Sequence, residues 1–99
     1  MLLMKRIYFD AIRTGAKTTT LRYWRTPRVR AGGTYRIHGL GRIEVLTIAP
    51  TTLTALTNTD AQADGFADLP TLKRALRKLY SPMQRKARTL YQIRFVFLG

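Results

Sequence analysis

The stretch Gly15-Ala16-Lys17-Thr18-Thr19-Thr20-Leu21-Arg22 decides how the first part of the chain folds. The segment before it, residues 9–14, is predicted to form about one and a half helical turns. Gly15 then stands where a helix prefers a left-handed final residue. Residues 18–24 are rich in β-branched and aromatic side chains, which favour strands. The stretch therefore predicts a short helix, a glycine turn and a strand, with two cations near one end of that strand.

The cations and threonines of this stretch divide between two faces if the strand includes Lys17. Residues of equal parity share a face of an extended strand, so Lys17, Thr19 and Tyr23 would face one way. Thr20 and Arg22 would then face the other way, unless the strand bulges or begins after Lys17. The stretch is not a Walker-type phosphate loop, because that motif needs a second glycine and its lysine immediately before a helix.

The rest of the chain predicts further strands and two helices. Asp60 is expected to cap a short helix that Gly65 ends, and Asp68 to cap a second helix that runs to about residue 80, where Pro82 stops it. The polar segment 51–59 is a strand or the exit from one. The predicted strands, besides 18–24, are residues 2–8, 34–38, 42–49 and 89–98.

The order β-α-β-β-β-α-α-β has too many strands and too short crossovers for a doubly wound parallel sheet. It predicts an α+β fold, a small and mostly antiparallel β-barrel with short helices packed at its openings. Ninety-nine residues suit one domain, residues 1–99.

The excess of positive charge points to a nucleic-acid partner. Eighteen Lys and Arg side chains stand against five Asp and Glu, for a net charge of +13. Four of the five acids lie between residues 43 and 72, a segment without a basic residue, and Asp10 is the acid outside it. Most of the cations are Arg, which suits bidentate phosphate contacts and stacking on bases. RNA is favoured over DNA; an acidic protein or an anionic membrane surface is the alternative, although no long amphipathic basic helix supports the membrane.

Composition also limits the other classes of function. Without cysteine, neither disulfides nor thiolate metal sites are available, and His38 alone makes no metal site, so we expect no metal and no cofactor. The apolar runs are too short to span a bilayer and the first residues lack a signal-peptide pattern. The expected location is the cytoplasm, with no membrane association.

Aromatic and basic residues alternate directly after the opening strand. Tyr23 and Trp24 precede Arg25, Arg28 and Arg30, and single-stranded recognition uses such a mixture because bases stack on rings while cations follow the backbone. Trp24 is equally interpreted as a core residue. The candidate nucleic-acid-binding residues are Lys17, Arg22, Tyr23, Trp24, Arg25, Arg28, Arg30, Lys73, Arg74 and Arg77, the last three on a helix face that is otherwise simply solvated.

The G-x-K-x-x-x-x-R pattern, with the helix before it, resembles the signature of the ASCH domain of the PUA-like superfamily, in its small bacterial single-domain type. The segment from Val29 to Ile37 and the acidic-Gly-Phe segment from Asp60 to Phe66, followed by a helix and Tyr80, also resemble that family. The resemblance covers nearly the whole chain. It implies a β-barrel with a cleft lined by Lys17 and Arg22, in a family regarded as RNA-binding.

One branch of that family removes the acetyl group from N4-acetylcytidine, and the resemblance implies catalytic residues for this reaction. By position they are Lys17, Thr20 and Asp64, where the family has Glu in place of Asp64. Lys17 would be the nucleophile and Asp64 the proton donor to the leaving amine. Three alternatives remain: Lys17 and Arg22 bind a phosphate or a base, Arg22 pairs with Asp64 to order the cleft, or the cleft cleaves RNA. The expected ligand is RNA for the binding and cleavage alternatives, or a modified nucleoside for the deacetylation reaction.

Overall fold

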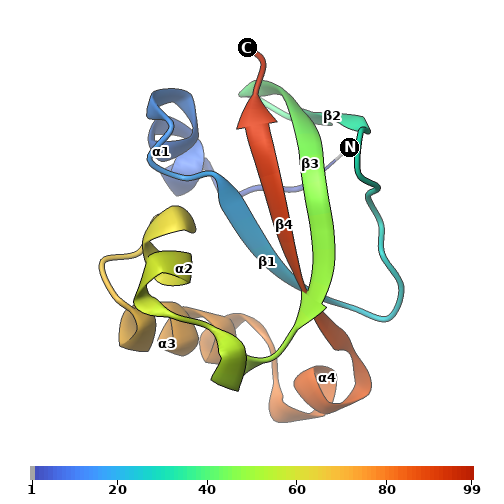
Figure 1. Cartoon of the computed structure of the whole chain (residues 1–99), viewed down its shortest axis with the longest axis vertical. Coiled ribbons are helices and arrows are strands. Elements are labelled where there is room, and N and C mark those ends of the chain that lie inside the picture. Colours follow the sequence, from blue (N-terminus) through green and yellow to red (C-terminus); the bar gives the residue numbers. More distant parts are fainter. Residues whose placement is uncertain (1) are drawn as a thin grey trace.

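Alternating apolar residues make the C-terminal segment one of the two inner strands of the sheet. In β4 (Thr89–Phe97), Leu90, Ile93 and Phe95 are buried. The computed structural model describes residues 2–99, in which β1 (Thr19–Trp24), β2 (Thr34–Ile37), β3 (Gly41–Thr51) and β4 form one antiparallel sheet in the order β1-β4-β3-β2. The sheet curls into a half-barrel whose edge strands β1 and β2 are not paired with each other (Figure 1). The α+β class and the antiparallel, barrel-like sheet are confirmed.

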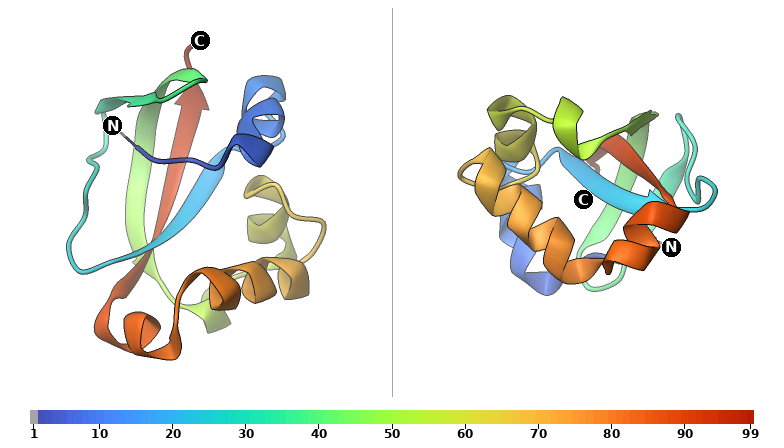
Figure 2. Two further views of the ribbon diagram at one scale, coloured as in Figure 1. Left: turned by 180° about the vertical axis from the view of Figure 1, so that it is seen from behind. Right: turned by 90° about the horizontal axis from the view of Figure 1, so that it is seen from below.

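Four short α-helices pack around the sheet (Figure 2). α1 (Phe9–Thr14) precedes β1, α2 (Asn58–Ala63) and α3 (Leu69–Leu79) lie beside it, and α4 (Pro82–Ala87) leads into β4. Two 3₁₀ turns, η1 (Arg6–Tyr8) and η2 (Leu53–Ala55), complete the chain. One buried cluster lies between the sheet and α1, and a second joins β1 to α2 and α3. No helix among residues 2–99 is long and apolar enough to cross a membrane.

The predicted opening strand over residues 2–8 is wrong. Leu2 N donates to Arg36 O at 3.1 Å, but the chain then turns into η1 instead of continuing along β2. Leu3 and Ile7, which made this segment look like a strand, are 73% and 78% exposed. The first residues therefore cross the open side of the half-barrel.

Helix ends follow local capping rules, with two corrections. Thr57, not Asp60, is the N-cap of α2; Asp60 is the third helical residue and closes a capping box with Thr57. Pro82 does not merely stop α3, which ends at Leu79, but opens the unpredicted α4, whose N-cap is Ser81. Asp68 caps α3 as predicted.

The inner strand β4 provides a test of the packing. Ile93→Ala removes a fully buried side chain of the strand that lies between β1 and β3 in the sheet, and we expect it to lower the free energy of unfolding by about 2–5 kcal/mol. Val96→Ala, at a 44% exposed position of the same strand, should change it by less than about 1 kcal/mol. Urea unfolding of the two variants measures the difference, and equal losses would contradict this core assignment.

Candidate functional site

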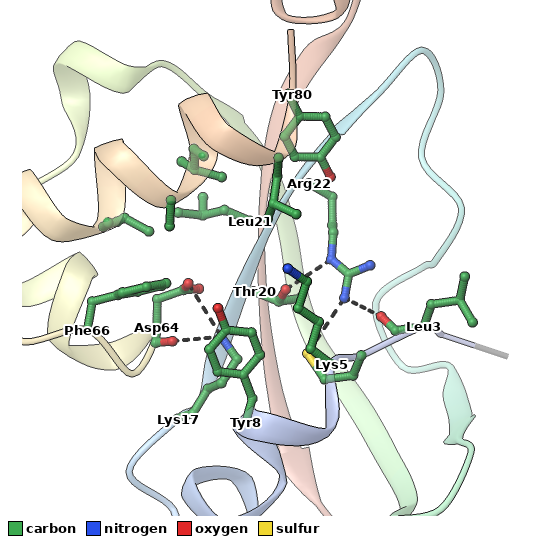
Figure 3. Close-up of a pocket in the computed structure, with 15 residues that line it drawn as sticks. Leu3, Lys5, Tyr8, Lys17, Thr20, Leu21, Arg22, Asp64, Phe66 and Tyr80 are labelled. Atoms are coloured by element: carbon green, nitrogen blue, oxygen red, sulfur yellow. Dashed lines mark hydrogen bonds and ion pairs between the residues drawn. The ribbon is translucent and has the colours of Figure 1, made fainter.

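A pocket of about 330 Å³ opens between the N-terminal segment, β1, the end of α2, and α3 (Figure 3). Its charged lining residues are Lys5, Lys17, Arg22 and Asp64, and Thr20 adds a hydroxyl. Leucines of α3 and three aromatic rings form its apolar wall. A hollow of this size with few polar groups is typical of a small-molecule site.

Backbone contacts bring Lys17 and Asp64 together across 47 positions of sequence. Thr18 N donates to Ala63 O at 2.8 Å, which fixes the C-terminal end of α2 at the start of β1. Gly65, with φ +93°, makes the turn after α2, and a β-carbon added at this position would lie 3.5 Å from Lys17 Cβ. A side chain at Gly65 would be strained in this conformation. The glycine therefore allows the turn that carries Asp64 to fold against Lys17.

Lys17 is a buried lysine, only 3% exposed, held by polar partners. Its Nζ donates to the backbone oxygen of Asp64 at 2.7 Å and lies 3.4 Å from Asp64 Oδ2. Thr19 Oγ1 donates to the other carboxylate oxygen, Oδ1, at 3.1 Å. The ammonium also lies 4.9 Å from the centre of the Tyr8 ring, within cation–π range. The ion pair is thus made by Lys17, and the expected Arg22–Asp64 pair does not form.

Burial moves the pKa values of the two partners toward each other. Loss of hydration lowers the pKa of Lys17, and the attraction of Asp64 only partly opposes this. Loss of hydration likewise raises the pKa of Asp64 to about 6, against the opposing effect of Lys17. A neutral amine beside a protonated carboxyl is therefore more accessible here than for the same groups in water.

Arg22 is held by neutral partners on the other side of the pocket. Its Nε donates to Thr20 Oγ1 at 3.0 Å, and its Nη2 donates to Leu3 O and contacts Met4 Sδ at 3.7 Å. Burial lowers the pKa of Arg22, although a guanidinium stays protonated in proteins. Because Thr20 Oγ1 accepts from Arg22, its own O–H remains available to a ligand.

Lys17 and Thr20 line the same pocket, because the strand begins after Lys17, which is the exception that the parity argument left open. β1 begins at Thr19, after Lys17, and the alternation that separates residues of unequal parity does not extend to Lys17. The structure places the predicted set Lys17, Thr20, Asp64 and Arg22 in one hollow.

The rings predicted to stack on bases are not free to do so. Tyr23 and Trp24 are 6% and 8% exposed and belong to the two core clusters. The core interpretation of Trp24 is confirmed, because β1 is covered on both faces. Tyr8, Phe66 and Tyr80 line the pocket instead (Figure 3). No pattern in the sequence marks Tyr8 or Phe66 as pocket residues beyond their place in or beside the motifs that resemble the ASCH domain.

The other basic residues that were predicted to bind nucleic acid lie outside the pocket. Arg25, Arg28 and Arg30 are exposed in the connection between β1 and β2. A separate shallow hollow on α3 is lined by Leu69, Pro70, Lys73, Arg74 and Arg77. Figure 1 shows the connection and α3 on different sides of β1, so these cations form two regions and not one continuous stripe. Among residues 2–99 no group of three or more His, Cys, Asp or Glu side chains is placed to hold a metal ion.

The buried carboxyl predicts a pH-dependent stability of unusual sign. Folding raises the pKa of Asp64 from 3.8 to about 6, so between these values the folded protein holds a proton that the unfolded chain has lost. The contribution of Asp64 to the free energy of unfolding is therefore present below pH 4 and lost as pH rises to 6. We expect the free energy of unfolding of the wild type, minus that of Asp64→Asn, to fall across this window by on the order of 3 kcal/mol, since one pKa unit corresponds to about 1.4 kcal/mol. Urea unfolding of both proteins at several pH values measures this difference.

The control has the opposite sign. Hydrogen bonds from Thr71 lower the pKa of Asp68. The free energy of unfolding of the wild type, minus that of Asp68→Asn, should therefore rise with pH as that carboxylate ionises. A difference for Asp64→Asn that also rises with pH would contradict the described environment of Asp64.

Comparison with known proteins bears on the fold. No family model matches the sequence, and no curated protein matches it. Among solved structures, hypothetical protein PH0355 is similar, with a TM-score of 0.80 at 15% identity over 95% of this chain and 94% of that one. An ASCH domain from Lactobacillus crispatus JV V101 has a TM-score of 0.77 at 15% identity over 91% and 69% of the two chains. Protein EF3133 from Enterococcus faecalis V583, of the DUF984 family, has a TM-score of 0.68 at 16% identity over the same shares. The half-barrel, its helices and this likeness together show that the chain has the fold of an ASCH-type small domain.

Proposed function

We propose that this chain binds RNA and receives one nucleobase of the strand in the pocket between β1 and α3. The observation that carries the proposal is the lining of that pocket. Half-buried rings of Tyr8, Phe66 and Tyr80 offer apolar contact to a flat base, and the Thr20 hydroxyl offers a hydrogen bond to its edge. Single-stranded RNA is recognised by this combination, because an unstacked base exposes both its faces and its edges.

The charge of the chain supports a polymer over a free base. A nucleobase is neutral and needs no surface of net charge +13, whereas a strand brings one phosphate per nucleotide. The exposed arginines of the β1–β2 connection and the cations of α3 lie outside the pocket, where a strand that extends beyond the bound base would meet them. Base recognition and phosphate attraction are thus assigned to different residues.

The proposal predicts that ring and charge variants weaken RNA binding in different ways. Affinity of wild type for a short labelled single-stranded RNA should fall with salt, with a log–log slope of several units at about 0.7 per neutralised phosphate. Arg77→Gln should reduce the magnitude of that slope by about 0.7, the contribution of one phosphate contact. Tyr8→Leu keeps an apolar side chain but removes the ring, and should cost about 1–3 kcal/mol with the slope unchanged.

Fluorescence anisotropy at several salt concentrations measures all three proteins. A nearly salt-independent affinity of the wild type would overturn RNA binding. A Tyr8→Leu variant with wild-type affinity would remove the base from this pocket and leave phosphate binding alone.

The second candidate is hydrolysis of the acetyl amide of N4-acetylcytidine, favoured by the meeting of Lys17, Thr20 and Asp64 in one pocket. A neutral Lys17 amine would attack the acetyl carbon while Asp64 gives its proton to N4 of the leaving cytidine; the Asp64 carboxylate would then take up the proton that the acylated Lys17 nitrogen loses. Water would finally cleave the acetyl–Lys17 bond, which releases acetate and restores the amine. Asp64 lies 3.4 Å from Lys17, so the shorter acid reaches its partner in spite of the missing methylene. The shifted pKa values favour the required proton positions.

This candidate predicts that Lys17→Met abolishes turnover, because the substitution keeps the aliphatic stem and removes the amine. Deacetylated product is followed by chromatography for N4-acetylcytidine alone and within a short RNA. Lys86→Met, on exposed α4, is the control and should keep full turnover. Since Lys17→Met leaves Asp64 buried without its cation, Thr20→Val serves as a second variant and circular dichroism verifies both folds. Product formed by folded Lys17→Met would sink the role of Lys17 as nucleophile.

A further inference from the structure

Two cations at the pocket have no carboxylate partner. Four charged side chains line it, Lys5, Lys17, Arg22 and Asp64, and Lys17 takes the single carboxylate. In the described part of the chain neither Lys5 nor Arg22 forms an ion pair. With Asp64 ionised, the pocket therefore carries an excess of two positive charges, one of them on the partly buried Arg22.

The guanidinium of Arg22 has an unused edge. Its Nε and Nη2 are bound to Thr20, Leu3 and Met4, whereas Nη1 has no hydrogen-bond partner among residues 2–99. In this part of the chain every fully buried side-chain nitrogen has a partner, so Nη1 must be accessible to solvent. A protonated, pre-positioned N–H group at the side of a pocket is suited to an anionic oxygen of a ligand.

Lys5 reaches the same region from the N-terminal segment. Figure 3 shows its side chain extending across the pocket toward Thr20 and the Arg22 guanidinium. The bonds from Arg22 Nη2 to Leu3 O and Met4 Sδ hold the two residues that precede Lys5. Arg22 thereby fixes the backbone that carries the second cation, and two like charges are kept on one side of the pocket.

We propose that Lys5 and Arg22 form a site for the phosphate group of a nucleotide whose base occupies the same pocket. The inference rests on the proposed base binding and names the ligand more closely, as a nucleotide and not a nucleoside. A phosphate carries up to two negative charges and three acceptor oxygens, which match one ammonium and the open edge of one guanidinium. The single carboxylate of the pocket is engaged by Lys17 and Thr19 and does not compete for these cations.

The test compares nucleosides with their phosphates. Calorimetric titration of wild type with the four ribonucleosides, their 5′-monophosphates, their 3′-monophosphates and inorganic phosphate identifies which group is bound. For at least one base, a monophosphate should bind about tenfold or more tightly than its nucleoside, and that advantage should shrink as salt increases. Inorganic phosphate alone should bind far more weakly, since it lacks the contacts of the base.

Substitution of Lys5 assigns the site. Lys5 is exposed, and its only hydrogen bond within residues 2–99 is made by its backbone oxygen, which accepts from Tyr8 N; Lys5→Gln should therefore fold normally. It should remove most of the advantage of the monophosphate and leave the affinity of the nucleoside unchanged. Lys86→Gln, at an exposed residue that is not part of the pocket lining, should alter neither.

Each outcome separates this inference from the function on which it rests. Equal binding of nucleoside and monophosphate, or an advantage that survives Lys5→Gln, would overturn the phosphate site while base binding stands. If no nucleoside or nucleotide binds the folded protein, both fail. Tight binding of inorganic phosphate with no gain from any base would likewise reject a nucleotide and leave a simple anion site.

Discussion

The buried contact between Lys17 and Asp64 is the interaction on which the rest of the site depends. It joins Lys17, two residues before β1, to the residue after α2, and the neighbouring bond from Thr18 N to Ala63 O fixes the same two elements through the backbone. Removing two charges from water is unfavourable, and the hydrogen bonds from Lys17 and Thr19 to Asp64 offset only part of that cost. An isolated partner would lose this compensation, which is why the two groups are energetically a unit.

Arg22 is the second organising residue, and it acts on the opposite wall. Its bonds to Leu3 and Met4 replace the strand pairing that the N-terminal segment lacks and hold that segment across the open side of the half-barrel. The pocket is thus the space between two anchored walls, one held by Lys17 and one by Arg22. The signature lysine and arginine shape the cavity as well as offering charge to it.

The chain combines a local pocket with a surface of large positive charge. In the proposed function, the unselective long-range attraction would concentrate phosphate polymers near the surface, and the rings and hydroxyl of the pocket would distinguish one nucleotide from another. The shifted pKa values of Lys17 and Asp64 arise from the same burial that shapes the pocket. Binding and hydrolysis therefore place similar demands on these residues, and the two proposed functions share one architecture.

Local sequence alone determined the α1–Gly15–β1 unit, the strands β2 to β4 and the cap of α3 at Asp68, because alternation and capping act over a few residues. The excess of cations was equally visible in the composition. Only the tertiary structure decided that Tyr23 and Trp24 are core and that Tyr8, Phe66 and Lys5 line the pocket. Periodicity shows that a side chain is buried or exposed, but which distant residues it meets depends on the packing of α2, α3 and the N-terminal segment around β1.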